Sequence, residues 1–273
     1  MNAPDHRMML PDIQADRDRR NLAIQRVGIK SVVYPVTIAS QKRPGHAAQP
    51  SVAHIDMYVG LPPDVKGTHM SRFLEILHEN QQSLSFSGMQ NMMTAMLQRL
   101  GADSGYIEMR MPYFISKTAP VSRVASLMDY QVTLKAEQNN GALKTIWQVM
   151  VPVTSLCPCS KHISRYGAHN QRSHITIAAE ISGEITIEAL VTIAERAASC
   201  ELYGLLKRPD EKYVTERAYD NPKFVEDLVR DIAIALNAQD QIIAYSVASE
   251  NFESIHNHSA YALIEHDKRK PPR

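Results

Sequence analysis

The stretch YQVTLKAEQNNGALKTIWQVMVPV, residues 130–153, decides the fold class. From Tyr130 to Ala136, apolar or aromatic residues alternate with polar ones, which is the pattern of a strand with one buried face. The Asn-Asn-Gly step at residues 139–141 favours a tight turn, and residues 145–153 again read as a strand. These residues therefore predict two neighbouring antiparallel strands near the middle of the chain.

The residues before this turn predict two strands, two helices and two further strands. The strands are expected at 32–38, 55–61, 106–115 and 130–136, and Thr68 is expected to cap the first helix. The second helix carries an apolar stripe at helical spacing, formed by Met89, Met92, Met93, Met96, Leu97 and Leu100. We interpret this stripe as core packing rather than as an adaptable methionine-rich binding surface.

The residues after the turn repeat the same order of elements. Strands are expected at 145–153, 174–181, 241–248 and 260–264, with helices at 186–198 and from Asn221-Pro222 onward. Both halves read ββααββ without sequence identity between them, which predicts an α+β protein of antiparallel sheets with helices on one face. The predicted divisions are a flexible N-terminal extension (1–30), a first module (31–140), a second module with most of the active site (141–266) and a tail (267–273).

Composition excludes several classes of protein. The 273 residues include 30 Lys+Arg and 29 Asp+Glu, so the net charge of +1 argues against a nucleic-acid-binding arm. With 44% hydrophobic and 22% charged residues, the chain has the composition of an ordinary globular protein. No run of about 18 apolar residues exists to cross a membrane, and the first thirty residues lack the apolar segment of a secretory signal. Three sparse cysteines predict a reducing compartment, the cytoplasm.

The densest group of reactive side chains is Ser155-Leu-Cys-Pro-Cys-Ser-Lys-His162, followed by His169 in a loop after Gly167. A proline-stiffened C-x-C cannot easily give both thiolates to one metal, and a buried cysteine pair or a redox pair would also explain Cys157 and Cys159. His169 favours a functional reading, because Cys and His within one strand–loop–strand unit are familiar ligands of zinc or iron.

Three further groups carry titratable side chains. Residues 201–212 are either a solvated loop or a place where basic side chains meet a phosphate chain and Glu211 completes a metal site. Between the last two strands, Glu253 and His256 are candidates for general acid and base, or for ligands. Glu226 lies early in a predicted helix, where the helix dipole alone would explain an acid.

Together these blocks resemble the type IB subfamily of GTP cyclohydrolase I, over roughly residues 30 to 265. The matching strings are Gly67-Thr-His-Met-Ser-Arg-Phe73, Ser155-Leu-Cys-Pro-Cys-Ser-Lys161, Gly167-Ala-His-Asn-Gln-Arg-Ser173, Lys207-Arg-Pro-Asp-Glu-Lys212, Asn221-Pro-Lys-Phe-Val-Glu-Asp227 and Glu253-Ser-Ile-His-Asn-His-Ser259. The resemblance implies the tunnelling fold with two ββααββ modules per chain. It also implies a homotetramer with active sites at subunit interfaces.

The resemblance implies hydrolysis of GTP to 7,8-dihydroneopterin triphosphate and formate, the first step of tetrahydrofolate biosynthesis. One divalent metal per site, zinc, manganese or iron, would be held by Cys157, His169 and Glu211. Glu226 would anchor the guanine edge, and the acid–base cluster would comprise Cys159, Glu253 and His256 beside Cys157. The candidates for binding the triphosphate are Lys207, Arg208, Lys212, His69 and Arg72, the last two reaching across a subunit interface.

Two alternatives stay open at this point. The nitrile reductase of the queuosine pathway shares the fold and uses a cysteine nucleophile with NADPH, and residues 201–207 faintly resemble its motif. His169, Glu253 and His256 argue against it, because a thioimide mechanism does not require them. The third reading is a non-catalytic module that binds purine nucleotides.

Overall fold

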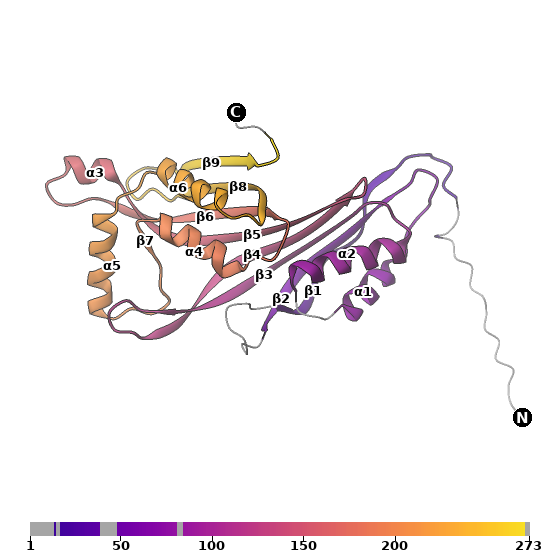
Figure 1. The fold of residues 1–273 in the computed structure, drawn as a ribbon, viewed down its shortest axis with the longest axis horizontal. Helices are drawn as coiled ribbons and strands as arrows, with labels where there is room; N and C mark the ends of the chain where they lie inside the picture. Colours follow the sequence, from indigo (N-terminus) through magenta and orange to yellow (C-terminus); the bar gives the residue numbers. More distant parts are fainter. Residues whose placement is uncertain (1–13, 15–16, 39–47, 81–83, 271–273) are drawn as a thin grey trace, which may run out of the picture.

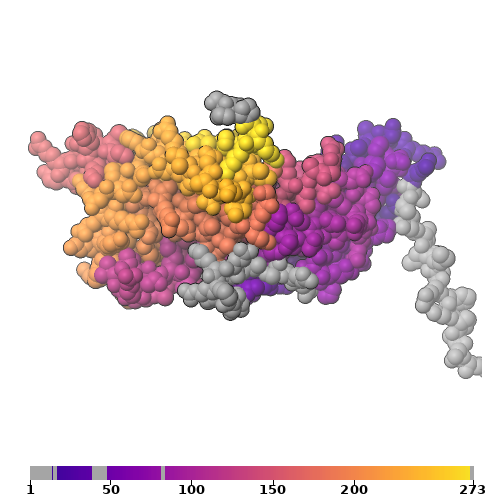
Figure 2. Space-filling model, viewed as in Figure 1, coloured from indigo at the N-terminus to yellow at the C-terminus, as the bar shows by residue number. Residues whose placement is uncertain are grey.

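The computed structural model describes residues 14, 17–38, 48–80 and 84–270. Within them, nine strands form one antiparallel sheet in the order β1-β2-β3-β4-β5-β6-β8-β9, with β7 paired to β5 beside this path. Helices α1, α2, α4 and α6 lie along the sheet, and α3 and α5 lie at one end of it (Figure 1). The molecule is elongated, with α1 and α2 of the first half toward one end and α5 of the second half at the other, where the turn between β3 and β4 also lies (Figure 1 and Figure 2).

The elements have the following bounds. The strands are β1 (Ile24–Ile38), β2 (Gln49–Leu61), β3 (Gly105–Thr118), β4 (Ala125–Asn139), β5 (Ala142–Leu156), β6 (Asn170–Ile181), β7 (Cys200–Glu201), β8 (Ile242–Asn251) and β9 (Ala260–Asp267). The helices are α1 (Met70–Glu79), α2 (Phe86–Leu100), α3 (Pro158–Ile163), α4 (Ile187–Ala197), α5 (Arg208–Asp220) and α6 (Val225–Asn237). None of the helices in these described ranges is long and apolar enough to cross a membrane.

The predicted central hairpin is confirmed. Asn139 of β4 pairs with Ala142 of β5, and the two residues between them, Asn140 and Gly141, have φ angles of 50° and 77°. Positive φ at both central residues matches the right-handed twist of the flanking strands, which is why Asn-Gly is favoured there. Because β4 and β5 pair from this turn to Gln131 and Met150, the two halves belong to one continuous sheet. The second half contains α3, β7 and α5 in addition to the predicted ββααββ order.

The core lies between the sheet and the helices of both halves. Met89, Met92, Met93 and Met96 of α2 are buried, as predicted, in one apolar cluster with Ile107 and Leu134 of the sheet. The same cluster continues through α4 and α6, so a single core serves the whole described fold. Alternate residues of the strands point away from it, and there Arg110 forms ion pairs with Asp56 and Glu108.

Two helix starts were wrong in the sequence-based prediction. Helix α1 begins at Met70 with His69 as N-cap, one residue after the predicted cap Thr68. Asn221 ends α5 instead of beginning α6, which starts at Val225. The amide of Asn221 donates to the carbonyl of Ala198 at 2.9 Å, so this side chain fastens the end of α5 to the end of α4.

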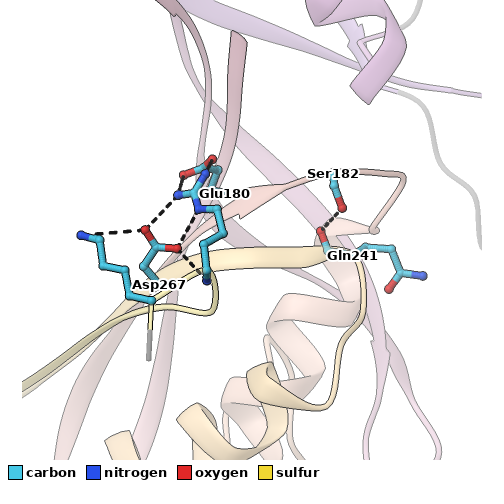
Figure 3. Close-up of polar contacts among 6 residues, drawn as sticks. Glu180, Ser182, Gln241 and Asp267 are labelled. Atoms are coloured by element: carbon cyan, nitrogen blue, oxygen red, sulfur yellow. Dashed lines mark hydrogen bonds and ion pairs between the residues drawn. The ribbon is translucent and has the colours of Figure 1, made fainter. Parts of the chain in front are cut away.

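The ends of the fold extend further than predicted. β1 begins at Ile24, inside the predicted N-terminal extension, while residues 1–13 and 15–16 lie outside the described ranges. At the other end, the side chain of Arg269 donates to Glu180 at 2.8 Å and to Asp267 at 2.7 Å, the contacts around Glu180 and Asp267 in Figure 3. Lys268 donates to the carbonyl of Leu236, so the predicted tail is fastened to the fold through residue 270.

The core assignment of the methionine stripe can be tested by truncation. Met93→Ala removes most of a side chain that is 0% exposed, and we expect it to lower the free energy of unfolding by about 2–5 kcal/mol. Met70→Ala, at a residue that is 40% exposed, is the matched control and should change stability by less than about 0.5 kcal/mol. Urea unfolding at one protein concentration measures both, and equal effects of the two substitutions would contradict the assignment.

Candidate active site

The site begins where β5 and β6 end their pairing. After the last strand pair, Leu156 with Asn170, the N–H of Cys157 donates to the carbonyl of His169 at 3.2 Å. The sheet register thus extends by one pair into the loop and sets Cys157 beside His169. Ser160 strengthens this junction, because its hydroxyl donates to the carbonyl of Cys157 at 3.1 Å and accepts from the N–H of His169 at 3.2 Å.

The two cysteines of the C-x-C segment have different surroundings. Cys157 is the N-cap of α3, half-buried, and its Sγ accepts a hydrogen bond from the N–H of Ser160 at 3.4 Å. Cys159 lies in the first turn of α3 and is exposed. Both are free thiols, as is the buried Cys200. The strand junction therefore fixes the backbone of Cys157, whereas Cys159 lies within the exposed first turn of α3.

A chain of hydrogen bonds connects His169 to the loop before β9. Nδ1 of His169 lies 3.0 Å from Oε1 of Gln171, whose amide nitrogen donates to Oε1 of Glu253 at 3.2 Å. The hydroxyl of Ser254 lies 3.3 Å from the same Nδ1. Three residues predicted from separate sequence blocks, Cys157, His169 and Glu253, thus meet at one end of the sheet. We refer to Cys157, His169, Gln171, Glu253 and Ser254 as the Cys–His–Glu cluster.

Gln171, Ser160 and Ser254 were not predicted as site residues. Gln171 follows His169 by two positions, and the alternation of a strand puts such residues on one face of the sheet. This spacing is the signal in the sequence that could have found Gln171.

Other predicted site residues lie around the cluster. Glu226 is exposed in the first turn of α6, and the N–H of Lys223 just before this helix donates to the carbonyl of Leu156 at 3.1 Å. The start of α6 therefore lies beside the end of β5, where Cys157 follows. His256 is exposed in the loop between β8 and β9, with its ring stacked on that of His258 at 5.2 Å.

Glu211 is separate from the Cys–His–Glu cluster in this structure. It lies in the first turn of α5, one turn before Val214 and Thr215, which line a cavity of about 420 Å³. Gln171 and Arg172 of β6 line the same cavity, so the face of α5 that carries Glu211 continues toward the cluster. No three His, Cys, Asp or Glu side chains are grouped to hold one metal ion within the described ranges.

The predicted phosphate-binding cations form two separate groups within one chain. Lys207, Arg208 and Lys212 are exposed at the start of α5, and Lys212 lies 3.8 Å from Glu216. His69 and Arg72 lie at the start of α1, and Figure 1 shows α1 and α5 over opposite ends of the sheet. One chain therefore does not bring all five cations to one place.

Comparison with known proteins decides the family. Residues 10–262 match the family described as type I GTP cyclohydrolase folE2. The chain is 58% identical to the GTP cyclohydrolase FolE2 of Paraburkholderia xenovorans and 60% identical to that of Cupriavidus necator, in each case over 98% of this chain and 99% of the relative. The chain belongs to the FolE2 family. This confirms the family and the enzyme class predicted from the motifs, and it favours GTP cyclohydrolase over the nitrile reductase and the non-catalytic module.

Solved structures agree in fold alone. A uricase from Bacillus fastidious superposes with a TM-score of 0.54 at 8% identity, covering 90% of this chain and 94% of the uricase. A highly active mutant of Bacillus sp. TB-90 urate oxidase gives 0.52 at 8% identity, covering 89% and 100%. Urate oxidases have the tunnelling fold, so the predicted fold class of this FolE2 chain is confirmed.

A buried acid holds the start of α5, the helix that carries the FolE2 motif Lys207–Lys212. Asp210 is 0% exposed and accepts from the N–H groups of Val121 and Ser122 at 2.8 Å each, and from the N–H of Lys207 at 2.9 Å. Burial by itself would raise the pKa of Asp210, but these hydrogen bonds and that of the Ser122 hydroxyl outweigh it and hold the pKa well below its usual value. The carboxylate thus joins α5 to the turn between β3 and β4.

Asp210→Asn is expected to lower stability at neutral pH, because the amide cannot accept all of these hydrogen bonds. A depressed native pKa stabilises the fold above the unfolded pKa of about 3.9, and this contribution is lost as the pH falls below it. The difference in urea midpoint between wild type and variant should therefore narrow from pH 7 to pH 3. Asp220→Asn, at an exposed position at the end of α5, is the control. A constant difference across this range would show that Asp210 is not held as an anion.

Proposed function

We propose that this FolE2 protein hydrolyses GTP to 7,8-dihydroneopterin triphosphate and formate at the Cys–His–Glu cluster, with one divalent metal ion per site. The observation that carries the proposal is the convergence of Cys157, His169 and Glu253 at the end of β5 and β6 in a chain of this family. The reaction opens the imidazole ring of guanine at C8, so it needs an activated water and groups that move protons.

The side chains of Cys157 and His169 fit a metal of the zinc, manganese or iron type. They offer a sulfur and a nitrogen donor from two residues whose backbones are hydrogen-bonded at the ends of β5 and β6. This combination of donors is found in zinc and iron sites. Nδ1 of His169 contacts Gln171 and Ser254, while Nε2 has no hydrogen bond to any described residue and is free to act as a ligand. Within one chain Glu211 is not grouped with these two side chains, and we propose it as the third ligand from the family motif at Lys207–Lys212. When bound, such an ion would lower the pKa of a coordinated water to about 7.

The remaining residues of the site would bind the guanine and transfer protons. Glu226 lies in the first turn of α6, whose start is near the end of β5, and would accept hydrogen bonds from two adjacent N–H groups of guanine. Glu253 is held in place by Gln171, so it is positioned to exchange protons with substrate next to His169. Cys159 follows Cys157 closely in the sequence, and His256 follows Glu253 closely. Both side chains are exposed, and they complete the proposed acid–base set.

The triphosphate requires cations from more than one chain in this proposal. Lys207, Arg208 and Lys212 would come from α5, and His69 and Arg72 from α1 of a neighbouring copy, because one chain separates the two helices (Figure 1). This division supports active sites at subunit interfaces and a homotetramer. β1 and β9 form the two edges of the sheet and are available to extend it between copies. We place the reaction in the cytoplasm, at the first step of tetrahydrofolate biosynthesis.

His169→Asn tests the metal site. We expect it to lower the metal content of the purified protein and to reduce formation of pterin from GTP at least about 100-fold, since losing even a partner of a ligand costs about 10–100-fold. Activity is measured with zinc, manganese or iron as pterin fluorescence after oxidation. His162→Asn, at an exposed histidine of α3, is the matched control. Full activity of His169→Asn with every metal would contradict the proposal.

Glu226→Gln tests recognition of the guanine. Hydrogen bonds to charged groups contribute about 1.5–3 kcal/mol, so we expect kcat/KM for GTP to fall at least about 10-fold, with the metal content unchanged. Glu184→Gln, at an exposed glutamate in the loop before α4, controls for the loss of a surface charge. If the two variants have the same kcat/KM, Glu226 does not bind the guanine.

A further inference from the structure

Gln171 occupies a central position in the Cys–His–Glu cluster that the proposed chemistry does not use. Its side chain is buried, at 9% exposed, and both ends of the amide have partners. The oxygen lies 3.0 Å from Nδ1 of His169, and the nitrogen donates to Glu253 at 3.2 Å. A side-chain amide whose oxygen and nitrogen both have hydrogen-bond partners is fixed in orientation. A flip would place its oxygen against another acceptor and its NH₂ group against another donor.

The chemistry of these three groups determines where the protons lie. An ionised carboxylate only accepts hydrogen bonds, so the NH₂ end of Gln171 must face Glu253. The carbonyl end then faces His169 and also only accepts, so Nδ1 of the imidazole must carry the proton. The hydroxyl of Ser254, at 3.3 Å, can accept from the same N–H. Nε2 is thereby left with its lone pair, and it has no hydrogen bond to any described residue.

We infer that Gln171 is a positioning residue that holds His169 as the tautomer protonated at Nδ1, which keeps Nε2 available as a ligand. The inference deepens the proposed function and rests on it for the role of His169 as a metal ligand. Free imidazole side chains favour the proton on Nε2, so this tautomer needs a fixed acceptor at Nδ1. Gln171 is such an acceptor, because it lies on β6 directly opposite Ser155 of β5 and its orientation is set by Glu253.

The arrangement also connects the proposed proton-transfer residue to the proposed ligand. Glu253 lies in the loop between β8 and β9, whereas His169 precedes β6, and Gln171 is the side chain that contacts both. Partners that orient a ligating histidine typically contribute about 10–100-fold to metal affinity. Gln171 should therefore affect metal binding without contacting the metal itself.

The tautomer can be observed directly in the metal-free full-length protein. Magic-angle-spinning NMR of protein labelled with ¹⁵N-histidine distinguishes protonated from unprotonated ring nitrogens, and the spectrum of His169→Asn identifies the signals of His169. At pH 8, we expect Nδ1 to be protonated and Nε2 unprotonated in the wild type. A wild-type His169 protonated at Nε2 would overturn the inference without any variant.

A substitution of Gln171 and a matched control separate positioning of His169 from packing. Gln171→Leu removes the acceptor at Nδ1 and should shift the proton of His169 to Nε2. Gln148→Leu, the same change on β5 at a half-buried glutamine, is the matched control. A tautomer unchanged in Gln171→Leu would overturn the inference, and far-UV circular dichroism verifies that each variant is folded.

Zinc affinity, measured by competition with a chelator, gives the second readout. We expect Gln171→Leu to weaken zinc binding about 10–100-fold and Gln148→Leu to leave it unchanged. Unchanged zinc affinity in Gln171→Leu would overturn the role of Gln171 in binding. If the wild type shows the expected tautomer but binds none of zinc, manganese or iron, the positioning by Gln171 stands and the proposed metal role of His169 fails.

Discussion

The antiparallel pairing of β5 with β6 is the constraint on which the site depends. It runs from Thr145 opposite Ile181 to Leu156 opposite Asn170, and it continues for one more pair through the backbone bond between Cys157 and His169. A shift of this register by one residue would turn the side chains of β6 to the other face of the sheet. Gln171 lies on the same face of β6 as the buried Ser173 and Ile175, so such a shift would turn it to the opposite, more exposed face and away from Glu253. The register therefore decides whether the cluster forms.

The same two strands explain why the pairing is rigid. β5 also pairs with β4 across the central hairpin, and β6 also pairs with β8, so neither strand is an edge. Alternate residues of both strands are buried against α4 and α6 in the common core. The reactive side chains follow directly at the ends of these strands, in loops that permit exposure. The paired strands thus fix the backbone from which the site residues begin, while the side chains of these residues can reach solvent.

The alternation in residues 130–153 and the methionine stripe were sufficient to predict the sheet and α2, because burial of one face imposes those periods. Helix α5 was missed since it has almost no apolar face, with only Asp210 and Ala218 buried, and the charges of Lys207–Lys212 read as a loop. Cys157, His169 and Glu253 were found from their chemistry. Gln171 was not, because an amide does not titrate and its role depends on a contact with a loop far away in sequence.

A chain with a net charge near zero can still bind an anion, because the local structure decides which charges are exposed. The net charge is +1, yet the acids near the start of α5 are not all free to repel a phosphate group. The charge of Asp210 is directed inward to the N–H groups of Val121 and Ser122, and Glu216 lies near Lys212. Lys207 and Arg208 form no ion pair with the described residues, so an approaching anion would encounter both of their charges, together with that of the exposed Glu211. A buried, satisfied acid can therefore leave a locally cationic surface on a nearly neutral protein, and a triphosphate responds to that local surface rather than to the net charge.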